Sequence, residues 1–177
     1  MKKVLLVLAV GTLFACNSSK QEEAKADATA ATAATTAPAS SLIPESEYGP
    51  MKNGIQAYCD GNQEVWMSGY AENAKVYYPG PGDSLVGKAG LEAFFKQRTD
   101  SVASASFINP TYAGIDNKVD GSTAKGKWLM SWGIFNIKYK NGKTAMLPIH
   151  LVHHIDAAGK TDIAAWYYDQ MDIVNAK

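Results

Sequence analysis

The sequence contains few of the residues on which many functions depend. It has only two cysteines, Cys16 and Cys59, and three histidines among 177 residues. Lys and Arg together number 17, as do Asp and Glu, so no basic excess is available to bind phosphates. It also lacks a phosphate-binding glycine loop, a nucleophile elbow and a dinucleotide fingerprint. We therefore expect neither a nucleic-acid partner nor a bound cofactor.

The first sixteen residues have the form of a bacterial lipoprotein export signal. Met1–Lys3 is positively charged, Val4–Phe14 is apolar, and Leu13–Cys16 resembles a lipobox. The apolar run is shorter than the roughly 20 residues that span a bilayer. We predict that residues 1–15 are removed and that Cys16 is acylated, anchoring the protein to the cell envelope on its periplasmic side or at the surface. An ordinary signal-peptidase site and an uncut anchor are the alternatives.

Residues 16–41 are predicted to be a disordered tether. This segment consists mainly of Ala, Thr and Ser and has no aromatic residue, so it can bury little apolar surface. The remaining residues, 42–177, have the composition and length of a single globular domain. With Cys16 lipidated, Cys59 has no disulfide partner within the chain. Its helical surroundings predict a small buried core residue.

Within the domain, the helical patterns precede most of the strand patterns. The first helix contains Tyr48 and Cys59 and stops at Gly61, and Asn62 caps a second helix that includes Tyr70. A short strand, 74–78, precedes a third helix that follows Gly87 and includes Val102. The later strands are expected over 107–115, 125–140, 144–155 and 162–174, with Pro110 causing a bulge and Asn141-Gly142 forming a primed hairpin turn. This order predicts an α+β domain with helices on one side of a curved antiparallel sheet.

Three segments of the domain carry a family resemblance: Tyr70–Val76, Gly87–Leu91 with the following Phe94-Phe95, and the stretch from Lys160 to Asp169. In their order and spacing they resemble the nuclear transport factor 2-like superfamily, in particular its SnoaL-like branch. The resemblance implies a cone-shaped sheet with three N-terminal helices packed on its concave side, a pocket between them, and frequent dimerisation through the sheet. It does not imply a single activity, because this superfamily includes isomerases, cyclases, dehydratases and binding domains.

The 125–140 strand is apolar on both faces. One face carries Trp128, Met130, Trp132 and Ile134, and the other carries residues such as Leu129 and Phe135. An antiparallel strand with two apolar faces is expected to be covered on both sides. Helices would cover one face, and we predict a second copy of the chain on the other. The sequence leaves open which face of each strand points inward.

Two residues in the strand patterns are candidates for proton transfer. Asp169 is the single charged residue on a face with Ile163, Ala165 and Tyr167, where burial would make it a general acid or base. A hydrogen bond from a backbone turn is the alternative role. His150 is the histidine expected in the pocket, as a proton shuttle or a wall residue. His150 and His154 lie about 13 Å apart in an extended strand, so we expect no metal site.

The aromatic residues suggest a pocket for a flat apolar ligand, with core packing as the alternative. The ligand-binding candidates are Trp66, Tyr78, Trp128, Trp132, His150, Trp166 and Tyr168. The preferred hypothesis is a membrane-tethered binding domain. The second is an isomerase, dehydratase or cyclase in which Asp169 is the base, His150 assists, and Tyr78 or Tyr168 polarises a carbonyl. Other members of the superfamily have an acidic residue nearer the position that aligns with Trp166. The indole of Trp166 cannot act as a base, which weakens the isomerase or cyclase hypothesis. The third is a non-catalytic envelope protein that docks a protein partner.

Overall fold

The computed structural model describes residues 39–80, 84–171 and 173. The expected signal peptide, Cys16 and most of the expected tether lie outside these residues. The elements, in chain order, are β1 (Ser40–Leu42), the 3-10 helix η1 (Glu45–Tyr48), α1 (Gly49–Asp60), α2 (Gln63–Ser68), β2 (Tyr70–Tyr77), β3 (Ser84–Val86), α3 (Gly87–Ser101), β4 (Val102–Asn117), β5 (Gly126–Tyr139), β6 (Thr144–Ile155) and β7 (Thr161–Tyr168).

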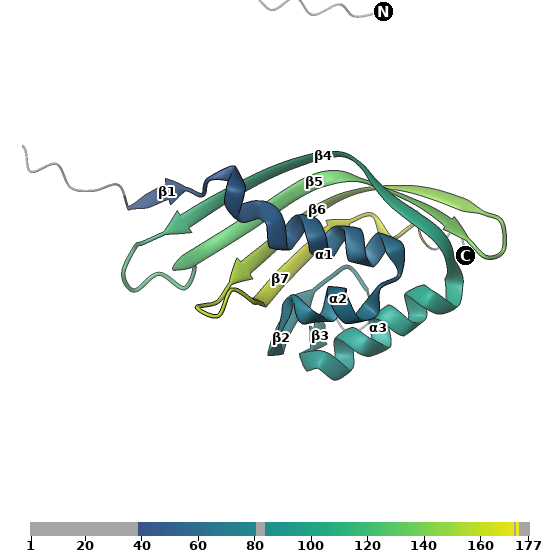
Figure 1. Cartoon of the computed structure of the whole chain (residues 1–177), viewed down its shortest axis with the longest axis horizontal. Helices are drawn as coiled ribbons and strands as arrows, with labels where there is room; N and C mark the ends of the chain where they lie inside the picture. Colours follow the sequence, from purple (N-terminus) through teal and green to yellow (C-terminus); the bar gives the residue numbers. More distant parts are fainter. Residues whose placement is uncertain (1–38, 81–83, 172, 174–177) are drawn as a thin grey trace, which may run out of the picture. The chain divides into compact units, whose positions relative to one another are not determined.

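The strands form one curved, open sheet in the order β1-β4-β5-β6-β7-β2-β3. Figure 1 shows this sheet curving around the three helices, which lie on its concave side. We call the face toward the helices the inner face and the opposite one the outer face. The predicted α+β fold class is confirmed. The sheet is not wholly antiparallel, because β2 pairs with β7 in parallel. Such a pairing needs a long connection, and α3 and strands β3 to β6 supply it here.

The ends of α1 and α2 follow the sequence signals closely. Pro50 lies in the first turn of α1, where its missing N–H removes no helical hydrogen bond. Gly61 ends α1 with a φ of 74°, a left-handed conformation that favours glycine. The side chain of Asn62 caps α2 by accepting a hydrogen bond from the Val65 backbone N–H at 3.1 Å. The predicted helix stop at Gly61 and the predicted cap at Asn62 are confirmed.

Tyr70 and Val102, predicted at the ends of helices, instead begin strands. Helix α2 stops at Ser68, and the Gly69 carbonyl accepts a hydrogen bond from the Thr161 N–H. This contact draws the next residue, Tyr70, into β2 beside β7. Val102 pairs with Tyr139 and begins β4. In both cases pairing with a distant strand outweighs the local helical pattern.

The β5–β6 hairpin is confirmed, but the predicted type of its turn is wrong. Gly142 has a positive φ of 87°. Among the non-glycine residues of the described chain, Asn109 alone has a positive φ, so the φ of Asn141 is negative. Asn141 therefore lacks the positive φ that a primed two-residue turn requires. The Gly142 N–H instead donates to the Tyr139 carbonyl, and the Tyr139 N–H donates to the Lys143 carbonyl. This is the three-residue type of hairpin, in which a type I turn is followed by a left-handed glycine.

The largest differences in strand length from the sequence prediction are in β4 and β7. Strand β4 is longer than expected and has the irregularity predicted at Pro110, with a register shift between Ile108 and Thr111. Strand β7 is shorter and ends at Tyr168 rather than near residue 174. Helical residues follow at 170, 171 and 173. Asp169 therefore lies just beyond the strand that was expected to contain it.

The core fills the space between the inner face and the helices. Leu91 and Phe95 of α3 are completely buried, and Val76 of β2 is too. Next to them, aromatic rings from α1, α2, α3 and β7 form one continuous cluster. Its members include Tyr58, Trp66, Phe94 and Trp166. Cys59 is unpaired and buried, as expected of a core residue.

Candidate functional site

A pocket of about 110 Å³ lies between the helices and the inner face of the sheet. Helices α1, α2 and α3 form one wall with residues that include Pro50, Met51, Gly54, Ile55, Tyr58, Trp66 and Phe94. Strands β5, β6 and β7 form the other with residues that include Phe135, Leu147, Ile149, Leu151, His153, Thr161, Trp166 and Tyr168. An engineered cavity of roughly 150 Å³ accepts benzene, so this volume suits a ligand the size of a single ring.

The pocket wall is almost entirely apolar. Among the residues that the structure describes, no Asp, Glu, Lys or Arg lines it. A charged ligand would therefore lose its hydration without gaining an ionic partner, which is strongly unfavourable in a low-dielectric site. The polar side chains in the wall are His153, Thr161 and three tyrosines, Tyr58, Tyr70 and Tyr168.

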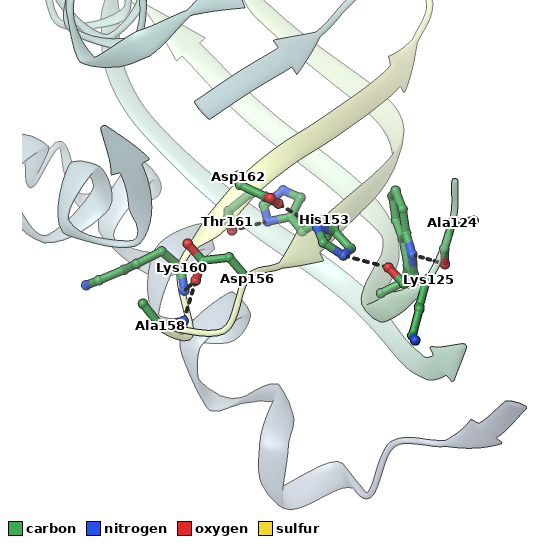
Figure 2. A network of polar contacts seen from close by, with 10 residues as sticks. Ala124, Lys125, His153, Asp156, Ala158, Lys160, Thr161 and Asp162 are labelled. Atoms are coloured by element: carbon green, nitrogen blue, oxygen red, sulfur yellow. Dashed lines mark hydrogen bonds and ion pairs between the residues drawn. The ribbon is translucent and has the colours of Figure 1, made fainter. Parts of the chain in front are cut away.

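His153 is the most unusual of these polar groups. It lies on the inner face of β6 and is 8% exposed. Its Nδ1 contacts the Thr161 hydroxyl (Figure 2) at a distance of 3.4 Å. Its Nε2 is buried and has no hydrogen-bond partner among the described residues. Burial lowers the pKa of His153 to about 4, because the charged ring would lose its hydration. The imidazole is therefore neutral at pH 7.

Burial has the opposite effect on the tyrosines, because their charged form is the deprotonated one. It raises the pKa of Tyr168 to about 12 and moves the pKa values of Tyr58 and Tyr70 well above the ordinary value. For Tyr58, the nearby Arg98 guanidinium opposes this effect only in part. All three hydroxyls therefore keep their protons at neutral pH.

Three of the predicted ligand-binding residues lie in this pocket. Trp66, Trp166 and Tyr168 line it, and the centroids of the two indole rings are 6.4 Å apart. Tyr78 packs beside the site, with its ring centroid 5.8 Å from that of Phe94 and 6.4 Å from that of Trp166. Tyr78 therefore supports the aromatic wall from outside the pocket lining.

Three other predicted site residues, Trp128, Trp132 and His150, lie on the outer face. Trp132 is directly opposite His150 on the neighbouring strand, and their rings stack with centroids 4.5 Å apart. Tyr167 stacks on the other side of His150 at 5.6 Å. Burial among these rings lowers the pKa of His150. The sheet separates this stack from the pocket.

Asp169 also lies away from the pocket. It is exposed, and its carboxylate accepts a hydrogen bond from the Met171 backbone N–H at 2.8 Å. This matches the role in a backbone turn that was the alternative to proton transfer. The structure thus does not bring Asp169, His150 and Tyr78 together at one site.

The pocket wall also contains four residues that were not expected there from the sequence, namely His153, Thr161, Tyr58 and Tyr70. A usable signal existed for His153. Ala145, Leu147, Ile149 and Leu151 alternate along β6 with more polar neighbours, and His153 continues that apolar face. Thr161 had no such signal, because a register shift between His154 and Ile155 interrupts the pairing beside it.

Residues 39–80, 84–171 and 173 contain no group of three His, Cys, Asp or Glu side chains arranged to hold a metal ion. Over the same residues, no helix has both the length and the apolar composition needed to cross a membrane.

Comparison with solved structures identifies the fold. A provisionally assigned polyketide cyclase from Xanthomonas campestris has a TM-score of 0.59 at 16% identity, covering 73% of this chain and 95% of that chain. An NTF2-like protein of unknown function from Burkholderia pseudomallei has a TM-score of 0.58 at 14% identity, covering 75% and 98%. The chain has the nuclear transport factor 2-like fold.

A further protein with the nuclear transport factor 2-like fold, TerC, was co-crystallised with polyporic acid. It has a TM-score of 0.57 at 14% identity and covers 73% of this chain and 96% of that chain. No family model and no curated protein matches the chain. At these low identities the structural similarity establishes the fold alone, and function depends on the site itself.

Proposed function

We propose that this protein binds a small, uncharged and largely apolar ligand in the pocket on the inner face. The observation that carries this proposal is a pocket whose described wall is aromatic and aliphatic and has no charged side chain. Such a wall favours a flat ring through apolar contact. The complex of TerC with polyporic acid supports small-molecule binding within this fold.

Binding is favoured over catalysis because the wall offers no carboxylate for proton abstraction among the described residues. His153, with a pKa lowered to about 4, is a weak base at neutral pH. Asp169 forms a backbone contact outside the pocket. We therefore expect Asp169→Asn to leave ligand affinity unchanged.

Two glycines of α1 give a matched test of the pocket. Gly54 lines the pocket and Gly49 does not, and a Cβ added at either position meets nothing within 4 Å. We expect Gly54→Leu to fill the pocket and weaken binding of ethylbenzene at least tenfold, whereas Gly49→Leu leaves it unchanged. Isothermal titration calorimetry measures both affinities. Equal binding by the two variants would refute this location for the site.

We also propose that acylated Cys16 anchors the protein to the bacterial envelope. The basis is the charged, apolar and lipobox order of residues 1–16. Acyl chains contribute about 0.8 kcal/mol per buried methylene, so several chains anchor a protein durably. Cys16→Ser should move the protein from the membrane fraction to the soluble fraction. A variant that is processed normally and remains in the membrane fraction would contradict the anchor.

A second copy of this chain is our proposed partner for the outer face. That face exposes 40% of Trp132 and 57% each of Met146 and Tyr167. Exposed apolar side chains grouped on one sheet face are typical of an association surface. Sedimentation analysis should show a dimer that Trp132→Glu converts to a folded monomer. A wild-type protein that stays monomeric at high micromolar concentration would contradict the proposal.

A further inference from the structure

His153 lies in a part of the pocket wall with few polar groups. On the neighbouring strands it pairs with Leu129 and Ala164, and its ring centroid lies 6.0 Å from that of Tyr70. The Thr161 hydroxyl is its one hydrogen-bond partner among the described residues. Since no charged side chain lines this pocket in the described structure, the ring's own hydrogen bonds determine its chemistry.

The contact with Thr161 favours one tautomer of His153. If Nδ1 carried the proton and donated to Oγ1, the hydroxyl hydrogen of Thr161 would need another acceptor. If the hydroxyl instead donates to an unprotonated Nδ1, the 3.4 Å contact satisfies both groups. A neutral imidazole has one N–H, so the proton then lies on Nε2. Nε2 of His153 is one of the buried polar atoms that have no hydrogen-bond partner among the described residues.

A buried N–H without a partner is unfavourable in a folded protein. The group becomes useful when a bound molecule brings an acceptor to it, because the same low dielectric strengthens that hydrogen bond. Neighbouring aromatic and aliphatic side chains, including Leu151 and Trp166, can hold the apolar remainder of such a molecule. The wall therefore combines a buried imidazole N–H and the protonated hydroxyls of three tyrosines with apolar contact.

We propose that His153 is the polar anchor of the pocket, and that its Nε2–H selects uncharged ring compounds carrying a carbonyl oxygen. This inference rests on the proposed binding function and adds the class of ligand. The volume of about 110 Å³ limits the ring system to about the size of one ring. A carboxylate on the same ring is rejected, because its charge would have no ionic partner. Thr161 acts as a positioning residue that holds the Nε2–H tautomer.

Three probes of similar size test this selection in the full chain at pH 7. Acetophenone carries the carbonyl, ethylbenzene lacks it, and benzoate replaces it with a charge. The measured quantity is the ratio of acetophenone affinity to ethylbenzene affinity, compared between the wild type and His153→Leu. We expect the ratio to fall about five- to tenfold in the variant, the loss typical of one hydrogen bond. Benzoate should bind at least tenfold more weakly than acetophenone.

Nitrogen-15 NMR of the imidazole provides a second readout that needs no variant. The free wild-type protein should show His153 as the Nε2–H tautomer, and acetophenone should shift its Nε2 resonance more than ethylbenzene does. Thr161→Val should yield a mixture of tautomers and a smaller affinity ratio. A protonated Nδ1 in the wild type would overturn the proposal.

The outcomes separate the two levels of the proposal. If no neutral probe binds, the proposed binding function fails and the ligand class fails with it. If ethylbenzene and acetophenone both bind and their affinity ratio is the same in wild type and His153→Leu, the pocket stands and His153 is not its anchor. A ratio that falls in His153→Leu and is unchanged in His150→Leu, on the outer face, supports the anchor.

Discussion

His153 and His154 are consecutive in the chain but lie on opposite faces of β6 in different surroundings. His153 faces the helices, and among the described residues its one hydrogen-bond partner is the Thr161 hydroxyl. On the outer face, Nδ1 of His154 lies 2.6 Å from the Asp162 carboxylate, and its Nε2 lies 3.1 Å from the Lys125 carbonyl. One face thus isolates a neutral ring, and the other uses a ring to join three segments of the chain.

The same contrast extends to the aromatic residues of the two faces. On the inner face, Trp166 is 8% exposed and packs against Trp66 and Phe94. Its chain neighbour Tyr167 points to the outer face and is 57% exposed. Both faces are apolar, but only the inner one is covered within the described part of a single chain. The comparison shows that an apolar face by itself does not identify the pocket side of a sheet.

The largest expected change in the free energy of unfolding is that of Trp166→Ala, for which Tyr167→Ala is the matched substitution on the outer face. Removing a buried indole leaves a cavity among rings, so we expect Trp166→Ala to lower the free energy of unfolding by about 3–5 kcal/mol. Tyr167→Ala removes an exposed ring and should lower it by less than about 1 kcal/mol. Urea unfolding of both variants, followed by circular dichroism, measures the two changes.

The control for this comparison is protein concentration. If a second copy covers Tyr167, the effect of Tyr167→Ala should grow at concentrations where the wild type is a dimer. Losses of equal size at low concentration would show that the two faces do not differ in burial within the single chain.

Much of the fold follows from local signals in the sequence. Pro50, Gly61 and Asn62 mark the helix ends by backbone chemistry that needs no distant partner. Tyr70 could not be assigned in this way, because the strand with which it pairs, β7, begins 91 residues later at Thr161. A local pattern carries little information about such long-range pairing.

The candidate site was less predictable because the side of each strand depends on the whole sheet. Trp128 and Trp132 share a face with the right spacing, yet nothing in β5 distinguishes that face from the one containing Phe135. The tail of β7 was also open to two interpretations. The alternation of apolar and polar residues predicted that Asp169 belongs to the strand. In the structure its carboxylate accepts a hydrogen bond from a following backbone N–H, as in a turn.

Unfolding at acid pH should distinguish His153 on the inner face from His150 on the outer face. The pKa of His153 falls from 6.5 to about 4 on folding, so the unfolded chain binds more protons between these values. The contribution of the neutral His153 to the free energy of unfolding is fully present above pH 6.5. It is lost as the pH falls toward 4, by a total of roughly 3 kcal/mol. Thermal unfolding of the wild type and His153→Gln from pH 7.5 to 4 measures this dependence. The variant should show the weaker dependence.

The control for the acid response is His150, whose pKa is also lowered by burial. His150→Gln should remove a smaller part of the acid response, because this histidine is only partly covered on the outer face. A response that His153→Gln leaves intact and His150→Gln abolishes would place the sensitive histidine on the outer face.

The smallest effect should come from breaking the contacts of His154. His154→Ala removes the contacts with Asp162 and the Lys125 carbonyl, and we expect a loss of about 1–2 kcal/mol in the free energy of unfolding. Urea unfolding at pH 7 measures this loss. Asp162→Asn, which keeps the size of the side chain, should lose less.

Gly126 offers a separate test of the same contacts. It has a φ of 116°, and a Cβ there would lie 2.5 Å from the His154 Nε2. Gly126→Ala should therefore displace the ring and strain the backbone together, and combining it with His154→Ala should destabilise the protein by less than the sum of the two single changes. Strict additivity would show that His154 does not hold the start of β5 to the β6–β7 hairpin. The changes at His154, Asp162 and Gly126 should leave the affinity for acetophenone unaltered, since the anchor His153 lies on the other face of the strand.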